Sequence, residues 1–360
     1  MPKRLVCSGC EQLPKLVFSE SDVYVHLPTD RHLVLVEREL TAHGYSFSRV
    51  DGGLLVPAVD FETFLGFLSS SVFNTVEKKD VKVLPLQRGE ELSFAAIRNL
   101  KSLSEWEVIA HGQDVVSIID EARIKTLFQP IIRAETGEIY GYEALSRGIL
   151  PDGSIMSPAR LFSQAKAMDL LFYLDRACRE ASLRAAARQG ITRKIFINFV
   201  PTAIYEPTLC LQTTARVLAE EGLDSEQVVF EVVETEKVED FDHLNRILDY
   251  YRDKGYSTAL DDIGSGFSDV GTLLQLRPDY MKIDMEVIRD IHLHPHKQEL
   301  LDVFIENGKK IGLSILAEGI ETLEEYRYLR ERDVDLMQGY LFGKPEEVPV
   351  TEISLPTLTC

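Results

Sequence analysis

The sequence lacks the features that mark several common classes of protein. No stretch approaches the roughly 18 consecutive apolar residues that a membrane helix needs. No long apolar run follows Lys3 and Arg4, as it would in a secretory signal peptide. There is also no P-loop and no G-x-S-x-G motif. We therefore expect a cytoplasmic protein without a membrane span.

Cysteine is scarce and odd in number, which argues against a secreted disulfide framework. The five cysteines are Cys7, Cys10, Cys178, Cys210 and Cys360. Cys7-x-x-Cys10 could be half of a zinc site or a redox pair, with the other half supplied by a dimer mate. No second Cys/His pair follows at finger-like spacing, so a plain N-terminal segment is the alternative.

Positively charged residues are much fewer than negatively charged ones. The chain carries 39 Lys and Arg against 58 Asp and Glu, for a net charge of −19. The imbalance is small in residues 1–112, with 12 against 15, and large in 113–360, with 27 against 43. Binding of polymeric nucleic acid calls for a basic face and is therefore not expected. A small phosphate ligand remains compatible, because bound divalent cations can invert the local field.

The first 87 residues favour a small α+β domain. Strand and helix patterns alternate in the order β-α-β-β-α-β, with Asp51-Gly52-Gly53 as a hairpin signal, which predicts a ferredoxin-like sandwich. Asp30 is the expected cap of a helix over 31–43. By analogy with other two-domain layouts, residues 1–87 are interpreted as a sensor or regulatory domain. Residues 88–112 would form a helical connector containing Trp106, the only tryptophan.

Residues 113–350 predict an atypical (β/α)8 barrel, followed by a C-terminal tail over 351–360. Strands over 126–133 and 138–146 are separated only by Glu135-Thr136-Gly137. That gap is too short for a parallel crossover, so the first strand must run antiparallel to the second. One helix is expected over about 158–188, and strands and helices then alternate to residue 341. Eight strands over this length fit a TIM-like barrel.

Seven of the predicted strands end in a carboxylate, an amide or a lysine. These residues are Glu143, Asn198, Glu231, Asp261 with Asp262, Lys282, Glu318 and Gln338. A single one of them would more often be a cap or a surface residue, but the whole series falls on one predicted rim. Oxygen donors in this number suit a hard cation such as Mg²⁺ or Mn²⁺, and two such ions can hold a phosphodiester and an attacking water together. Lys282 could orient or deprotonate that water, and Arg147 could grip a phosphate.

Glu143-Ala144-Leu145, followed by Arg147, resembles the signature of the EAL-domain cyclic di-GMP phosphodiesterases. The resemblance covers about 113–350, because the other motifs of that family follow in order. They are Phe128-Gln129-Pro130, Asn198, Phe230-Glu231-Val232-Val233-Glu234, Asp261-Asp262-Ile263-Gly264-Ser265-Gly266, Met281-Lys282-Ile283-Asp284, Ala317-Glu318-Gly319-Ile320-Glu321 and Gln338-Gly339-Tyr340. Val233 and Ile263 stand where the family often has threonine and phenylalanine, and neither change removes a ligand.

The resemblance implies a role for each of these residues. Glu143, Asn198, Glu231 and Asp261 would ligate one metal ion, and Asp261 and Asp262 the second. Glu318 would act through a metal-bound water and Lys282 would assist the attacking water, so that Lys282, Glu143 and Glu318 are the candidate catalytic residues. Gln129, Leu145, Arg147, Asp262, Glu321 and Gln338 would contact the nucleotide, and Glu234 would steady the aspartate-pair loop.

Two functions are compatible with these motifs. The first is metal-dependent hydrolysis of cyclic di-GMP to the linear dinucleotide pGpG, regulated by the N-terminal domain. The alternative is a catalytically silent cyclic di-GMP receptor or a protein-binding scaffold. Because barrels that resemble this one often pair through the region after the aspartate-pair loop, here about Phe267–Leu276, the resemblance also predicts a homodimer.

Overall fold

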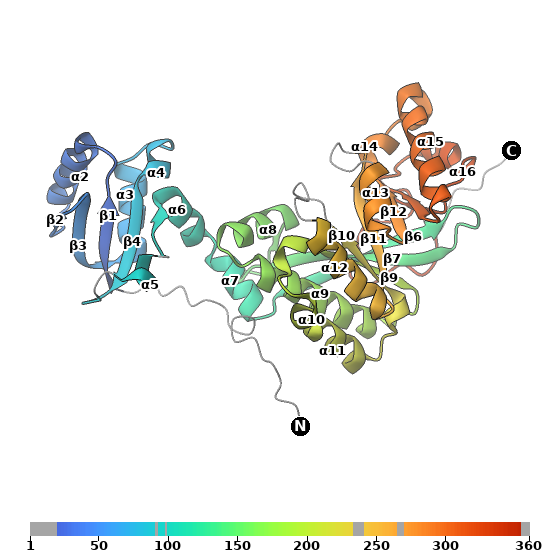
Figure 1. The fold of residues 1–360 in the computed structure, drawn as a ribbon, viewed down its shortest axis with the longest axis horizontal. Coiled ribbons are helices and arrows are strands. Elements are labelled where there is room, and N and C mark those ends of the chain that lie inside the picture. The colour runs from blue at the N-terminus through green and yellow to red at the C-terminus, as the bar shows by residue number, and fades with distance from the viewer. Residues whose placement is uncertain (1–19, 91–92, 98, 233–240, 265–269, 354–360) are drawn as a thin grey trace. The chain divides into compact units, whose positions relative to one another are not determined.

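The computed structural model describes residues 20–90, 93–97, 99–232, 241–264 and 270–353 (Figure 1). It divides into two compact units. One contains the described residues up to Ser117 together with Ala159–Leu170, and the other contains Ile118–Pro158 and the described residues from Leu171 onward. None of the described helices is long and apolar enough to cross a membrane. Glu234, Cys7 and Cys10 lie outside the described residues, and so does the first part of the expected dimer segment 267–276.

The N-terminal unit is built on an antiparallel sheet with the order β2-β3-β1-β4-β5. Its strands are β1 (Glu20–His26), β2 (Ser48–Val50), β3 (Gly53–Asp60), β4 (Lys82–Gln87) and β5 (Lys101–Ser102). Its helices are α2 (Asp30–Ala42), α3 (Phe61–Ser71), α4 (Glu77–Asp80), α5 (Phe94–Ile97) and α6 (Leu103–His111). The order of the first four strands is that of the predicted split β-α-β sandwich, and β5 extends it by one strand.

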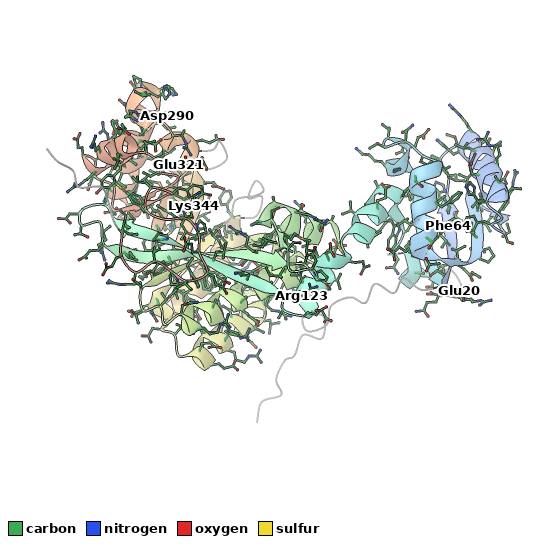
Figure 2. All side chains as sticks on the ribbon, turned by 180° about the vertical axis from the view of Figure 1, so that it is seen from behind. Glu20, Phe64, Arg123, Asp290, Glu321 and Lys344 are labelled. Carbon is green, nitrogen blue, oxygen red and sulfur yellow. The ribbon has the colours of Figure 1, made fainter. Side chains whose placement is uncertain are left out.

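Local sequence signals explain the helix starts in this unit. The side chain of Thr29, not that of the expected Asp30, caps α2 by accepting the backbone N–H of His32, and Asp60 caps α3 in the same way. Asp30 instead occupies the first turn of α2, where its negative charge favours the positive end of the helix dipole. Phe64 is fully buried on α3 (Figure 2).

The stretch expected to be a connector packs against this same sheet. Strand β5 pairs with β4, and the indole N–H of Trp106 on α6 donates to the carbonyl of Val83 at 2.8 Å. The Trp106 ring also contacts Phe61 edge to face. These contacts exist because residues 101–111 carry buried apolar side chains that need a partner surface.

The single helix expected over 158–188 is two helices, α8 (Pro158–Ala167) and α9 (Leu171–Arg188). Between them Asp169 adopts a left-handed conformation with φ of 57°, which an α-helix cannot continue through. Asp169 lies 3.5 Å from Lys101, and Arg160 of α8 lies 3.5 Å from Asp114. Helix α8 therefore belongs to the N-terminal unit and α9 to the barrel unit.

The second unit is a closed eight-stranded barrel. Its strands are β6 (Ile124–Arg133), β7 (Ile139–Ile149), β9 (Lys194–Phe199), β10 (Val228–Val232), β11 (Ser257–Ile263), β12 (Tyr280–Ile283), β13 (Ser314–Ala317) and β14 (Leu336–Gln338). Strand β6 is antiparallel to both of its neighbours, β7 and β14, while the other pairs around the barrel are parallel. This arrangement confirms the predicted barrel with a reversed first strand. The two-residue strand β8 (Ile155–Met156) pairs with the far end of β7.

Helices follow the strands and cover the outside of the barrel (Figure 1). Besides α9 they are α10 (Pro207–Cys210), α11 (Gln212–Glu221), α12 (Phe241–Asp253), α13 (Val270–Leu276), α14 (Met285–Ile288), α15 (Pro295–Lys310) and α16 (Leu323–Arg330). Short 3₁₀ turns are η1 (Pro201–Ala203), η2 (Ser225–Gln227) and η3 (Ile291–Leu293), and α7 (Gln113–Asp120) precedes β6.

An apolar layer fills the barrel interior, and the predicted strand-end residues lie directly above this layer. Seven strands each contribute one buried residue to the layer, and Tyr140 of the remaining strand, β7, packs against them. The seven are Ile131, Phe196, Val229, Ala259, Tyr280, Leu316 and Leu336. Because side chains on a strand alternate between its two faces, the residue two positions further along each strand also points inward.

Candidate active site

The predicted strand-end residues are one step above the apolar layer, toward the carboxyl ends of the parallel strands. Asn198, Glu231, Asp261, Lys282, Glu318 and Gln338 each follow a member of the layer by two positions, and Gln129 precedes Ile131 by two on the reversed strand. Glu143 breaks the two-residue step because the β6–β7 pairing shifts register at Tyr140. The barrel thus brings together residues from all eight strands or the loops directly after them.

Lys282 lies at the centre of this group and is almost fully buried. Its ammonium nitrogen is 2.9 Å from Glu231, 3.0 Å from Asp261, 2.8 Å from Glu318 and 3.9 Å from Glu143. Burial alone would lower the pKa of Lys282, but the four carboxylates raise it well above its ordinary value. Lys282 is therefore a charged donor in this arrangement, which favours orienting a water over deprotonating one.

Glu143 accepts hydrogen bonds from amide groups of two other strands. Asn198 donates to Glu143 Oε1 at 2.9 Å and Gln338 donates to Glu143 Oε2 at 2.7 Å. The Gln338 amide also reaches Gln129 Oε1 at 3.2 Å, and Gln129 donates to the carbonyl of Gly343. Burial opposes ionisation, but the Lys282 ammonium and these hydrogen bonds lower the pKa of Glu143. In this structure Gln129 and Gln338, expected to contact the nucleotide, are buried beside Glu143.

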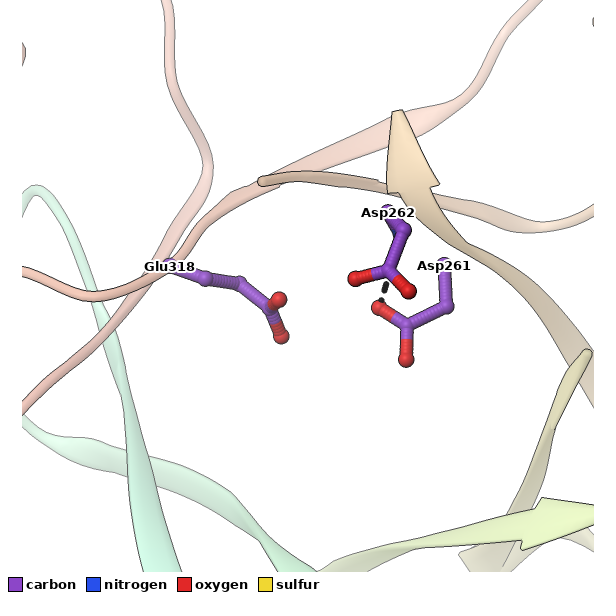
Figure 3. Close-up of side chains that lie close together, drawn as sticks. All are labelled: Asp261, Asp262 and Glu318. Carbon is purple, nitrogen blue, oxygen red and sulfur yellow. Dashed lines mark hydrogen bonds between the residues drawn. The ribbon is translucent and has the colours of Figure 1, made fainter. Parts of the chain in front are cut away.

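Asp261, Asp262 and Glu318 form a second group, and each offers an oxygen within 4.8 Å of the others (Figure 3). Strand β11 bulges between Leu260 and Ile263, and Asp262 there adopts a φ of 56°, which Asp tolerates better than most residues. The backbone N–H of Asp262 donates to Asp261 Oδ1 at 3.0 Å. The bulge presents two consecutive carboxylates to the same space, which a regular strand cannot do.

Burial raises the pKa of several of these carboxyl groups. Desolvation raises the pKa of Glu231 and of Glu318 well above their ordinary values, and it also raises that of Asp261. For Asp262, desolvation together with the charges of Asp261 and Asp284 raises the pKa to about 6. Five carboxyl groups share a single ammonium, so the group as a whole carries a strong negative potential when it is ionised.

The donor set fits divalent metal ions. It consists of carboxylate and amide oxygens, the ligands that Mg²⁺ and Mn²⁺ prefer. Among the described residues no backbone or amide N–H donates to either oxygen of the fully buried Glu231, whose counter-charge is Lys282. Buried carboxylates that lack donors carry an unfavourable desolvation cost, which a bound cation would offset. Glu143, Asn198, Glu231, Asp261, Asp262 and Glu318 are therefore suited to hold such ions.

The remaining expected residues lie around this cluster. Leu145 and Arg147 follow Glu143 on β7, and the half-buried Arg147 donates to the carbonyl of Ser146 at 2.9 Å. Burial lowers the pKa of the Arg147 guanidinium. Glu321 lies on the loop after β13 (Figure 2), where a two-pronged ion pair with Arg289, at 2.6 and 2.7 Å, engages its carboxylate.

Sequence reasoning missed Glu325, the residue that holds the Glu321 loop in place. This fully buried carboxylate accepts the backbone N–H groups of Asp290, Glu321 and Thr322 at 2.9, 2.9 and 3.0 Å. It forms a capping box with Thr322 at the start of α16. The T-x-x-E spacing is a known signal for such a cap and could have identified it.

The fold and the site together define a class: a TIM-like barrel whose first strand is reversed and whose carboxyl-terminal rim gathers five carboxylates around a buried lysine. Residues 113–345 match the family described as "EAL domain". The chain belongs to this family.

Two curated relatives match nearly two thirds of this chain. The cyclic di-GMP phosphodiesterase NbdA of Pseudomonas aeruginosa is 28% identical over 239 residues, which is 65% of this chain and 30% of that protein. The probable cyclic di-GMP phosphodiesterase PdeG of Escherichia coli is 31% identical over 242 residues, 63% of this chain and 45% of that protein. The match thus spans less than half the length of either relative.

A solved structure of similar sequence supports the same assignment. It is a standalone EAL protein from Vibrio cholerae in its c-di-GMP bound form, 36% identical with a TM-score of 0.59. The alignment covers 64% of this chain and 95% of the Vibrio protein. The matched part of this chain therefore corresponds to nearly the whole of that structure.

Proposed function

We propose that this chain hydrolyses one phosphodiester bond of cyclic di-GMP and releases linear pGpG, using two Mg²⁺ or Mn²⁺ ions. The observation that carries the proposal is the set of buried and half-buried oxygen donors gathered around the buried Lys282, in which every expected ligand is present. Relatives named as cyclic di-GMP phosphodiesterases and a similar structure bound to c-di-GMP support the choice of substrate.

The residues can be assigned to distinct tasks. Glu143, Asn198, Glu231 and Asp261 would hold one ion, and Asp261 with Asp262 the other. When bound, the ions would supply Lewis-acid chemistry that neutralises the phosphate and activates a water. Asn198 and Gln338 keep Glu143 oriented through their hydrogen bonds. The guanidinium of Arg147 can grip a phosphate in a forked geometry.

The protein's own side chains can also orient the attacking water and accept its proton. Lys282 Nζ lies 2.8 Å from Glu318 Oε1, so the pair can orient a water, with Lys282 as donor and Glu318 as acceptor. The raised pKa of Glu318 makes its carboxylate a stronger base than an exposed glutamate. Water would add to one phosphorus, its proton would pass to a Glu318 oxygen, and the P–O bond to one ribose would break. The released ribose oxygen takes up a proton from solvent water, and Glu318 returns its proton to the solvent.

A hydrolysis assay with a metal series tests this function. Wild-type protein should convert cyclic di-GMP to pGpG with Mg²⁺ or Mn²⁺, and Glu143→Ala should abolish turnover because it removes a ligand at the centre of the cluster. Glu138→Ala is the matched control, since Glu138 is an exposed glutamate at the turn before the same strand. Wild-type protein that stays inert with both metals, as a dimer and at alkaline pH, would overturn the proposal. Tight binding in calorimetry without turnover would identify a silent receptor instead.

We further propose that the N-terminal unit regulates the barrel and that the chain forms a homodimer through the barrel. Support for regulation is the presence of a separate compact unit with its own core. Deleting residues 1–110 should change activity, oligomeric state or ligand response, and no change in any of the three would contradict it. Light scattering that shows only monomer at micromolar concentration would contradict the dimer.

A further inference from the structure

Helix α9 contains a buried ion pair outside the proposed metal cluster. Asp175 and Arg179, one turn apart, are almost completely excluded from solvent. Arg179 Nε donates to Asp175 Oδ2 at 2.9 Å, and Nη2 lies 2.8 Å from the same oxygen. Arg179 Nη1 donates to Thr214 Oγ1 on α11 at 2.7 Å. A fully buried pair of this kind adds little net stability, because its desolvation offsets most of the Coulomb attraction.

The other oxygen of Asp175 contacts the chain beside a proposed metal ligand. Asp175 Oδ1 accepts the backbone N–H of Val200 at 2.9 Å. Val200 is the first residue beyond β9, where pairing with β10 has ended at Phe199. Two positions earlier, Asn198 donates to Glu143 at 2.9 Å. Asp175 therefore anchors the end of the strand that presents Asn198.

Helix α9 also contacts β7. The buried Cys178 thiol, on the same face of the helix as Asp175, interacts with the Ser146 side chain. Ser146 follows Glu143 by three positions on β7. One helix thus contacts both of the neighbouring strands that carry Glu143 and Asn198, β7 at Ser146 and β9 just beyond its end.

We propose that Asp175 is a positioning residue for the metal site. Arg179 orients the Asp175 carboxylate, which accepts the backbone N–H of Val200. This hydrogen bond fixes the backbone after β9 and so fixes the position of Asn198 relative to Glu143. The inference rests on the proposed metal-dependent function. Groups that orient metal ligands from behind typically contribute 10- to 100-fold to metal affinity, so the effect is measurable by metal binding alone.

Two double variants separate this role from a purely structural one. Asp175→Asn with Arg179→Met removes both charges but keeps an oxygen that can accept the Val200 N–H. Asp175→Leu with Arg179→Met removes both charges and that acceptor. The readout is the Mn²⁺ dissociation constant of the full chain, from the EPR signal of free Mn²⁺, with a thermal unfolding curve for each variant. Thr214→Val is the matched control, because it removes the hydrogen bond that Arg179 donates to Thr214 and leaves the bond between Asp175 and Val200 intact.

The asparagine variant should bind Mn²⁺ within about threefold of wild type, and the leucine variant should bind at least about tenfold more weakly. Thr214→Val should lower stability and leave Mn²⁺ affinity unchanged. Should the leucine variant fail to fold, Asp175→Ala with Arg179→Met, which needs no extra volume, takes its place. Equal Mn²⁺ affinity in the asparagine and leucine variants would overturn the inference alone. A wild-type protein that binds no Mn²⁺ would overturn the proposed function and this inference with it.

Discussion

At the scale of single residues, the site depends on a balance between one ammonium and several buried carboxylates. Lys282 lies within 4 Å of four of them, and its pKa is raised although burial opposes its charge. Without metal ions it is the main counter-charge for Glu231, which receives no backbone or amide hydrogen bond from the described residues. Lys282 therefore contributes to stability as well as to the proposed chemistry.

Replacing Lys282 with methionine should destabilise the metal-free barrel by about 3–5 kcal/mol, because removing one partner leaves the others as uncompensated buried charges. Thermal unfolding in EDTA measures this loss, and Mn²⁺ should restore part of it. Hydrolysis should be lost in the same variant. Lys310→Met is the control, since its pair with Glu306 is largely exposed and solvent screening leaves such a pair little effect on stability. Equal losses in the two variants would contradict the role given to Lys282.

At the scale of elements, two loops on the carboxyl-terminal rim are joined by one carboxylate. Glu325 on α16 accepts N–H groups from the loop after β13 and from Asp290, which lies between α14 and η3. Arg289 and Glu321 add an ion pair between the same two segments. These contacts fix the position of Glu321, a candidate nucleotide contact.

Glu325→Gln should lower stability at neutral pH by about 2 kcal/mol, because charge-assisted hydrogen bonds are replaced by weaker ones. The pKa of Glu325 is lowered by these backbone N–H groups although burial opposes the charge. Its contribution is therefore fully present above the unfolded pKa of about 4.5 and is lost as the pH falls through the lower folded value. Urea unfolding at several pH values should show the wild-type advantage shrink in acid. Glu324→Gln, its exposed neighbour, should change little at any pH.

At the scale of the whole molecule, the boundary of the EAL match and that of the compact units do not coincide. The family match begins at residue 113 and includes α8. In the structure Ala159–Leu170 pack within the N-terminal unit, where Lys101 and Asp114 pair with them. A chain cut at the family boundary loses much of the surface on which these residues pack.

A truncated chain of residues 113–360 should therefore be cleaved by proteases between 159 and 170, while the full chain resists cleavage there. Limited proteolysis followed by mass spectrometry locates the cuts. Cleavage within the exposed turn 151–154, which the N-terminal unit does not contain, should be the same in both chains. Equal protection of 159–170 in both chains would show that α8 does not need the N-terminal residues.

Several features could be predicted because they depend on neighbours in the chain. The three-residue gap at 135–137 excludes a parallel crossover, and the reversed first strand followed from it. The positions of Glu231, Asp261 and Lys282 at predicted strand ends placed them on one rim, because parallel strands bring their carboxyl ends together. The four-strand order of the N-terminal sheet followed from the order of elements in the same way.

Tertiary structure alone decided which of those residues touch. Gln338 donates to Gln129 across 209 positions of sequence, and the same Gln338 amide donates to Glu143. Because the helix breaks at Asp169, α8 belongs to one unit and α9 to the other, although the apolar spacing of 158–188 predicts a single helix. Local patterns determine which face a side chain takes, because strand and helix periods are short-range. Hydrogen-bond partners are set by how distant segments close into the barrel, which no local pattern contains.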